Sequence, residues 1–254
     1  AFTVYPISES LLLLGNIREK ETIISVLKKA ARWLLKNNED IAMNQTMVAL
    51  AALYNVYLLT KEKKILNGIK DKLKQLSKSQ TDEGWFNEYK GADIGYTALG
   101  LDYLAKYWSK SKDPAAYKVM DKMLYFLSHF LHPDGTVGGE YGSRNTEYLL
   151  PHAFELLAKK NNTALQIRNY MLLALKGRKN MFLEKSLDYR YFIYMCYDYL
   201  QAHDSFCNKK ITPQKIKNTR KYFPKSGLFI LQNENYLFIA NLKKGGVFHI
   251  YSDN

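Results

Sequence analysis

Apolar side chains recur at helical spacing along most of this chain. In residues 21–37 they fall every three or four positions on one side, which predicts an amphipathic helix. Asn44 then precedes a broad apolar face, and we expect its side chain to cap the helix that follows. The same reasoning predicts further helices over 8–17, 62–79, 95–109, 114–131, 147–160, 164–176 and 188–203.

The pattern changes after Lys225. Short apolar runs over 227–231, 236–240 and 246–251 are separated by turns that contain Asn or Gly, which is typical of β-strands. A sheet this small needs cover from helices or from further strands. We therefore expect the sequence to be part of a longer protein.

A polar and aromatic pattern occurs twice, about 50 positions apart. Each copy has an acidic, glycine-containing loop, a Glu-Tyr pair and then a helix. The matching positions are Asp82, Glu88, Tyr89, Tyr96 and Leu104 in the first copy and Asp134, Glu140, Tyr141, Tyr148 and Leu156 in the second. A repeat of this length fits two helices with their loops, which predicts helical hairpins stacked as a solenoid or as an α/α toroid. In a toroid, the loops 80–94 and 132–146 would line one cleft.

Together these patterns predict a mainly α-helical chain. We expect an incomplete α/α toroid of helical hairpins over 1–210, a linker over 211–224, and the start of a small antiparallel β-sheet domain over 225–254.

Charge narrows the choice of partners. The chain has a formal net charge of +13 and a pI near 9.4, which favours polyanions. Its lysines are scattered over predicted helix faces and form no block interleaved with aromatic residues, so we expect no nucleic-acid partner. An acidic polysaccharide or an anionic lipid surface fits such a field. No apolar run reaches the roughly 18 residues that span a bilayer, so no transmembrane segment is expected.

Several function classes are excluded by missing motifs. The sequence contains no HExxH, CxxC or GxxxxGK pattern, which excludes metalloproteases, zinc ribbons and P-loop NTPases, and we expect neither a metal nor a cofactor. It also lacks the Asp-rich DDxxD run that an isoprenoid-handling toroid would need. Cys196 and Cys207 are expected to be free thiols, with a short-loop disulfide as the alternative.

The first repeated loop concentrates groups that can hold a sugar. Trp85 and Tyr89 can stack on sugar faces. Glu88 and Asp93 supply carboxylates, and Tyr96 stands at the start of the next helix. The alternative is that the rings plug the toroid and the acids cap helices. The two loops together favour a functional cleft.

The second loop adds further candidates, namely Glu140, Tyr141, Arg144 and Asn145. Arg144 can bind a carboxylate or sulfate through two hydrogen bonds. His152, on the helix that follows, is a candidate for the same cleft, with a core imidazole as the alternative.

The segment Asp82–Tyr96 resembles the aspartate–glycine, glutamate and tyrosine motif of heparinase II/III-like polysaccharide lyases, which stands at the mouth of an α/α toroid. Asn44 at the start of a helix is similar to the asparagine helix of that family, and 133–143 resembles its later glycine-rich loop. The strands after Lys225 resemble the first strands of its C-terminal β-sandwich. The resemblance implies β-elimination on a uronate polysaccharide, with Tyr96 as the catalytic tyrosine and Asn44 neutralising the uronate carboxylate.

Elimination needs that neutralisation, because a charged carboxylate makes the adjacent C5 proton weakly acidic. From the residues alone, Arg144 or Asn145 could assist. Tyr96 fits the role of base or of acid, but its ordinary pKa of about 10 must be lowered by a cation such as Arg144 before it is a base near neutral pH. Thr97 follows where the lyases have a histidine, and His249 matches the histidine of the family's β-domain poorly, so we expect a structural role for it.

Two other functions stay open. A relative that binds acidic glycan without cleaving it, for example in polysaccharide assembly, would keep an aromatic cleft without convergent catalytic groups. An inverting glycoside hydrolase would need two carboxylates about 6.5–9.5 Å apart, for which Asp93, Glu88 and Glu140 are candidates. The sequence fixes neither the oligomeric state nor the compartment. A degradative lyase would be periplasmic or secreted, and a biosynthetic relative cytoplasmic.

Overall fold

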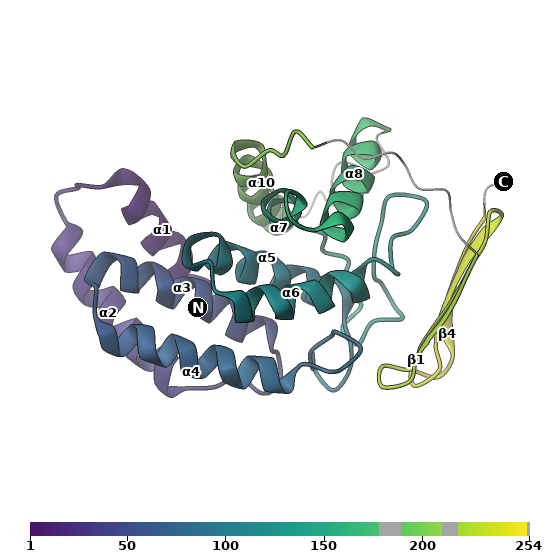
Figure 1. Ribbon diagram of the computed structural model, residues 1–254, viewed down its shortest axis with the longest axis horizontal. Helices are drawn as coiled ribbons and strands as arrows, with labels where there is room; N and C mark the ends of the chain where they lie inside the picture. Colours follow the sequence, from purple (N-terminus) through teal and green to yellow (C-terminus); the bar gives the residue numbers. More distant parts are fainter. Residues whose placement is uncertain (178–188, 210–217, 253–254) are drawn as a thin grey trace.

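Paired helices build most of the chain, and a small sheet follows them (Figure 1). The computed structural model describes residues 1–177, 189–209 and 218–252. The helices are α1 (Val4–Leu14), α2 (Lys20–Lys36), α3 (Asn44–Thr60), α4 (Lys63–Ser79), α5 (Ile94–Ser111), α6 (Pro114–Leu127), α7 (Pro151–Ala158), α8 (Asn162–Lys176) and α10 (Tyr189–Asp204). The prediction of a mainly helical chain with a small antiparallel sheet at its C-terminal end is confirmed.

The helices form two rows. In the inner row α3 packs against α1 and α5, and α5 packs against α7. In the outer row α4 packs against α2 and α6, and α6 contacts α8. The sequence explains the division, because α3 is apolar on most sides and largely buried, whereas α2 and α4 are amphipathic and carry most of their lysines on the exposed side. Consecutive helices thus pair as hairpins, and α10 packs on α7.

Side-chain caps begin several of these helices. Asp93 accepts a hydrogen bond from the amide of Tyr96 and caps α5, and Asn161 accepts one from the amide of Ala164 and caps α8. The prediction that Asn44 caps α3 is wrong. Asn44 is the first residue of that helix, and its side-chain amide donates to Glu88 instead.

The sheet has the strand order β1-β2-β3-β4 and is antiparallel throughout. Its strands are β1 (Thr219–Phe223), β2 (Leu228–Gln232), β3 (Tyr236–Asn241) and β4 (Val247–Ser252). The prediction of three strands missed β1, which lies within the range expected to be a linker. Its sequence TRKYF alternates between exposed and less exposed positions and ends on the fully buried Phe223.

One face of the sheet packs on the helices. Phe223 contacts the rings of Phe126 and Phe130 at centroid distances of 5.2 and 6.0 Å. Leu228, Ile230, Leu237 and Ile239 are buried on the same face and join the helical core. The sheet is therefore seated on α6, and it also contacts the loops that precede α5 and α7, because the Lys225 and Ser226 amides donate to Glu83 and Asn241 donates to Tyr141.

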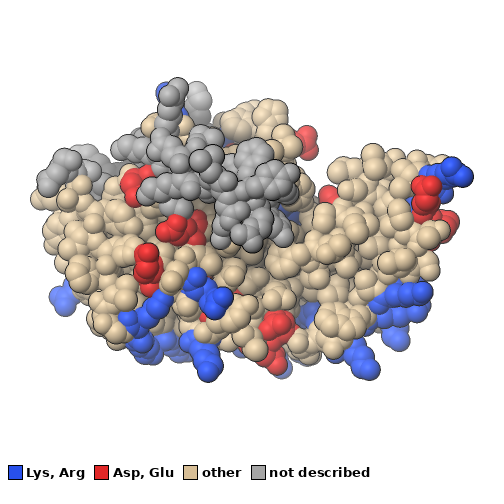
Figure 2. Space-filling model, turned by 180° about the vertical axis from the view of Figure 1, so that it is seen from behind, with Lys and Arg blue, Asp and Glu red and all other residues tan. Residues whose placement is uncertain are grey.

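Basic and acidic side chains are interspersed on one face of the molecule (Figure 2). Figure 2 shows lysine and arginine side chains spread along the lower edge of that face, with acidic residues between them. Among the described helices, none is both long and apolar enough to cross a membrane. Cys207 is buried, Cys196 is partly exposed, and both thiols are free.

Candidate functional site

The two repeated loops lie together. The amide of Ser143 donates to the carbonyl of Ala92 over 2.9 Å, and its hydroxyl donates to the carbonyl of Glu88 over 2.5 Å. The loops meet where α3 and α5 begin, on the side of the helices that faces the sheet (Figure 1). Direct contacts therefore place the two loops together, while the common cleft expected between them stays a prediction.

Asp93 fastens the loops to each other. Its carboxylate caps α5 and also accepts hydrogen bonds from the Arg144 amide, over 2.7 Å, and from the Thr146 hydroxyl. Asp93 is fully buried, and a Cβ at position 142 would come within 2.9 Å of its Oδ2, so Gly142 is required for this approach. The Asp93 carboxylate is thus used within the protein and offers no free oxygen to a ligand, which argues against the predicted substrate-binding role.

Glu88 and Asn44 form a second buried pair. The Glu88 carboxylate accepts from the Asn44 backbone amide over 2.7 Å and from Asn44 Nδ2 over 2.6 Å. Both residues are at most 3% exposed. Burial raises the pKa of Glu88 to about 8, against the opposing effect of the two Asn44 hydrogen bonds. Asn44 lies beside α5. Its Cα is so close to Gly100, one turn after Tyr96, that a Cβ placed on Gly100 would be 3.5 Å from it.

A cation and three aromatic rings occupy the accessible part of the junction. The Arg144 guanidinium lies 4.4 Å from the centroid of the Tyr89 ring. The Tyr96 ring lies 6.2 Å from Tyr89 and 6.1 Å from Tyr148. We call these four residues the Arg144 surface. Arg144 is exposed, Tyr89 is 39% exposed, and Tyr96 and Tyr148 are partly exposed.

The electrostatics of Tyr96 differ from the expectation. Burial raises the pKa of Tyr96 above its ordinary value, with a smaller contribution in the same direction from Tyr89, and Arg144 only partly opposes this. The predicted lowering of this pKa by a cation is therefore wrong for the unliganded protein. Tyr96 carries its proton at neutral pH and can act there as a proton donor.

Other predicted site residues lie outside this surface. Trp85 is 8% exposed, and its indole N–H donates to Glu83 over 2.7 Å, so it presents no face to a sugar. Tyr141 is fully buried. Asn145 is exposed with a φ of 58°, and its Oδ1 accepts from Lys244 over 2.6 Å.

The repeat therefore does not produce equivalent environments. Glu88 is buried, whereas Glu140 is exposed and pairs with His249 over 2.8 Å. Tyr89 is accessible, whereas Tyr141 is in the core. Residues at equivalent positions therefore differ in burial: Glu88 pairs with Ala42 before α3, whereas the backbone of Tyr141 is bound by Asn241 of the sheet.

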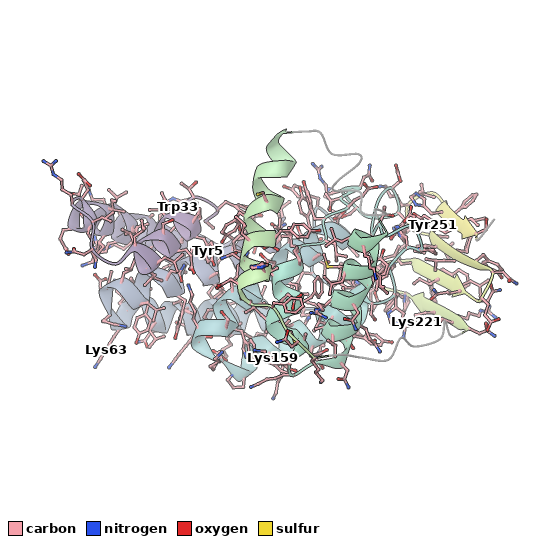
Figure 3. All side chains as sticks on the ribbon, turned by 90° about the horizontal axis from the view of Figure 1, so that it is seen from above. Tyr5, Trp33, Lys63, Lys159, Lys221 and Tyr251 are labelled. Carbon is pink, nitrogen blue, oxygen red and sulfur yellow. The ribbon has the colours of Figure 1, made fainter. Side chains whose placement is uncertain are left out.

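A hydrogen-bonded group at the junction with the sheet was not predicted as a unit. His132 Nε2 lies 2.7 Å from the Tyr141 hydroxyl, and His132 Nδ1 lies 3.0 Å from the Tyr251 hydroxyl. Tyr251 also lies 3.1 Å from His249 Nδ1, and Figure 3 shows it where the sheet meets the helices. Burial lowers the pKa of His132 to about 4. The sequence could not predict this group, because His249 and Tyr251 meet His132 only where β4 packs against the loop that precedes α7.

His152 lies in another part of the molecule. Its backbone amide donates to Asp198 over 2.9 Å, and Lys106 donates to both Asp198, over 2.8 Å, and Asp102. Burial lowers the pKa of His152 to about 4. Asp102, His152 and Asp198 have the side chains and the spacing of metal ligands. The Lys106 ammonium already supplies a positive charge between the two carboxylates, so the cluster fits a buried ion-pair network better than a metal centre.

No known family model, curated protein or solved structure matches this chain.

Proposed function

We propose that this protein binds a uronate-containing polysaccharide at the Arg144 surface and cleaves it by β-elimination. The observation that carries the proposal is the exposed Arg144 guanidinium stacked on Tyr89 beside Tyr96. Among the residues that the structure describes, the Arg144 guanidinium forms no ion pair. It is therefore available to a carboxylate from outside the protein.

This surface matches the chemistry of an acidic sugar. A guanidinium can hold a carboxylate through two parallel hydrogen bonds, and aromatic rings pack against the apolar faces of sugar rings. Arg144 and the rings of Tyr89, Tyr96 and Tyr148 supply both features within one contiguous group. Asn44 is less suited to binding the uronate carboxylate, because its amide is already bound to Glu88.

The elimination can be written with Arg144 neutralising the substrate and Tyr96 acting first as the base and then as the acid. Arg144 neutralises the uronate carboxylate, which stabilises negative charge at C5. The phenolate of Tyr96 takes the C5 proton, the C5–H electron pair forms the C4–C5 double bond, and the C4–O4 bond breaks. The Tyr96 hydroxyl then returns the proton to O4. Because the pKa of Tyr96 is raised, the phenolate is scarce at neutral pH and the reaction should be slow there.

Glycan binding without cleavage is the second candidate. The raised pKa of Tyr96 and the engagement of Asn44 by Glu88 favour it, since both remove groups that elimination would use. The hydrolase alternative has less support. Glu88 and Asp93 are at most 1% exposed, so only Glu140 of its three candidate carboxylates can reach a substrate.

The test is incubation with polyglucuronate, alginate and hyaluronan while following the ultraviolet absorbance of the unsaturated uronate. Elimination predicts a signal that Tyr96→Phe abolishes and that Tyr236→Phe, a change on the sheet, leaves intact. Binding without any absorbance change would replace elimination by the second candidate. New reducing ends without the unsaturated chromophore would instead favour hydrolysis.

A further inference from the structure

The turn between β3 and β4 reaches the loop that carries Arg144. It runs from Asn241 to Val247 and contains Gly245 and Gly246 with φ values of 67° and 76°. Asn241 Oδ1 accepts from the amide of Lys243 over 3.0 Å, which shapes the turn from within. The side-chain amide of Asn241 points the other way and donates to the carbonyl of Tyr141 over 2.7 Å.

Lys244 makes the main contact between this turn and the loop. Its ammonium donates to the carbonyl of Glu140 over 2.8 Å, to the carbonyl of Gly142 over 2.8 Å and to Asn145 Oδ1 over 2.6 Å. An ammonium has three N–H donors, and each has an acceptor here. None of these acceptors is a carboxylate, so the contact serves to hold backbone and amide groups in place.

Arg144 lies between these anchor points. Its own amide is held from the helical side by Asp93 over 2.7 Å. Asn145, the next residue, adopts a φ of 58°, in the left-handed region that asparagine enters more readily than most non-glycine residues. The hydrogen bond from Lys244 to Asn145 Oδ1 holds its side chain in this turn. The peptide that carries Arg144 is thus held by α5 on one side and by the sheet on the other.

We infer that Lys244 is a positioning residue for Arg144, and that the sheet thereby sets the direction of the guanidinium that receives the acidic sugar. This inference rests on the proposed function for the identity of the ligand. We call the three hydrogen bonds from Lys244 to the loop the clamp. The clamp lies within the chain, so its effect on the loop can be measured without any ligand.

The chain offers a matched control. Lys243 occupies the same turn and carries the same charge, but its ammonium donates to the carbonyl of Lys225 within the sheet domain. Lys244→Met and Lys243→Met therefore remove the same charge from neighbouring positions, and only the first removes the clamp. Lys244→Arg keeps the charge but presents its N–H donors in a rigid plane, which fits the three acceptors less well.

The first measurement is hydrogen exchange of the full chain without ligand. Lys244→Met should increase exchange at the amides of Gly142 and Arg144 by about tenfold or more, while Lys243→Met leaves them near the wild-type rate. Lys244→Arg should lie between these. Unchanged exchange in Lys244→Met, or an equal increase in both methionine variants, would overturn the clamp.

The second measurement is the affinity for polyglucuronate in a double-mutant cycle. If Lys244 acts through Arg144, Lys244→Met should weaken binding about tenfold in the wild-type background and less than about twofold in the Arg144→Ala background. Equal losses in both backgrounds would show that Lys244 contacts the polymer directly and would overturn the positioning role. If the wild type binds no uronate polymer, the proposed function fails. The exchange experiment would still show whether Lys244 holds the loop that carries Arg144.

Discussion

Glu88 offers a quantitative test of the buried pair beneath the Arg144 surface. Burial raises the pKa of this carboxyl from 4.5 to about 8, so the folded protein holds the proton more tightly than the unfolded chain does. The stabilisation from that proton is complete below pH 4.5 and is lost as the pH rises through 8. Glu88→Gln removes the titrating group and keeps the shape of the side chain.

The size of the effect follows from the two pKa values. Between pH 6 and pH 9 the folded state releases nearly one proton from Glu88, while the unfolded state has already released it. At about 1.4 kcal/mol per pKa unit, the free energy of unfolding of the wild type should fall by about 2.7 kcal/mol relative to Glu88→Gln over this interval. Other titrating groups contribute equally to both proteins and cancel in the difference.

The assay is urea unfolding followed by circular dichroism at several pH values between 6 and 9. Glu234→Gln, which changes an exposed glutamate in the β2–β3 turn, serves as the control and should give a flat difference from the wild type. A flat difference for Glu88→Gln as well would refute the reasoning. It would show that the two hydrogen bonds from Asn44 keep Glu88 ionised despite its burial.

Three further predictions concern other buried groups and the catalytic step. Asp93→Ala should destabilise the protein by about 2–4 kcal/mol in urea unfolding, because α5 loses its cap and the Arg144 amide loses its acceptor; a loss below about 0.5 kcal/mol would contradict the fastening role. Lys106→Met should cost about 3–5 kcal/mol, because Asp102 and Asp198 are left buried without their cation, whereas Lys78→Met on the exposed side of α4 should cost little. The rate of uronate elimination should rise steadily with pH from 7 to 10, because the raised pKa of Tyr96 keeps the phenolate scarce at neutral pH. A rate that levels off below pH 8 would exclude Tyr96 as the base.

The helices were predicted from the regular spacing of apolar residues along the sequence. The amphipathic spacing of α2 and α4 is visible in the sequence because each buries one face, and both helices lie within a residue or two of their expected bounds. The repeat also indicated that the loops before α5 and α7 lie together, and the hydrogen bonds between them agree with this, whereas the shared cleft stays a prediction. Strand β1 could not be seen in this way, because only Phe223 of its five residues is fully buried.

The burial of the candidate side chains could not be predicted. The sequence predicts that Trp85 stacks on a sugar. In the structure its indole N–H donates to Glu83 and its ring is buried. The sequence made His152 a candidate for the cleft of the two loops, but the packing of α7 on α10 places its backbone amide against Asp198. Lys244 gave no signal at all, because its three acceptors lie about 100 positions earlier and only the seating of the sheet brings them within reach.

The most direct test of the central claim is the affinity of the wild type and of Arg144→Ala for polyglucuronate and for its carboxyl-reduced, neutral counterpart, measured by calorimetry at one fixed salt concentration. We predict that the wild type binds the acidic polymer and not the neutral one, that Arg144→Ala weakens binding at least about tenfold, and that Arg220→Ala on the exposed part of β1 does not. Equal binding of both polymers, or an unchanged affinity in Arg144→Ala, would contradict the account.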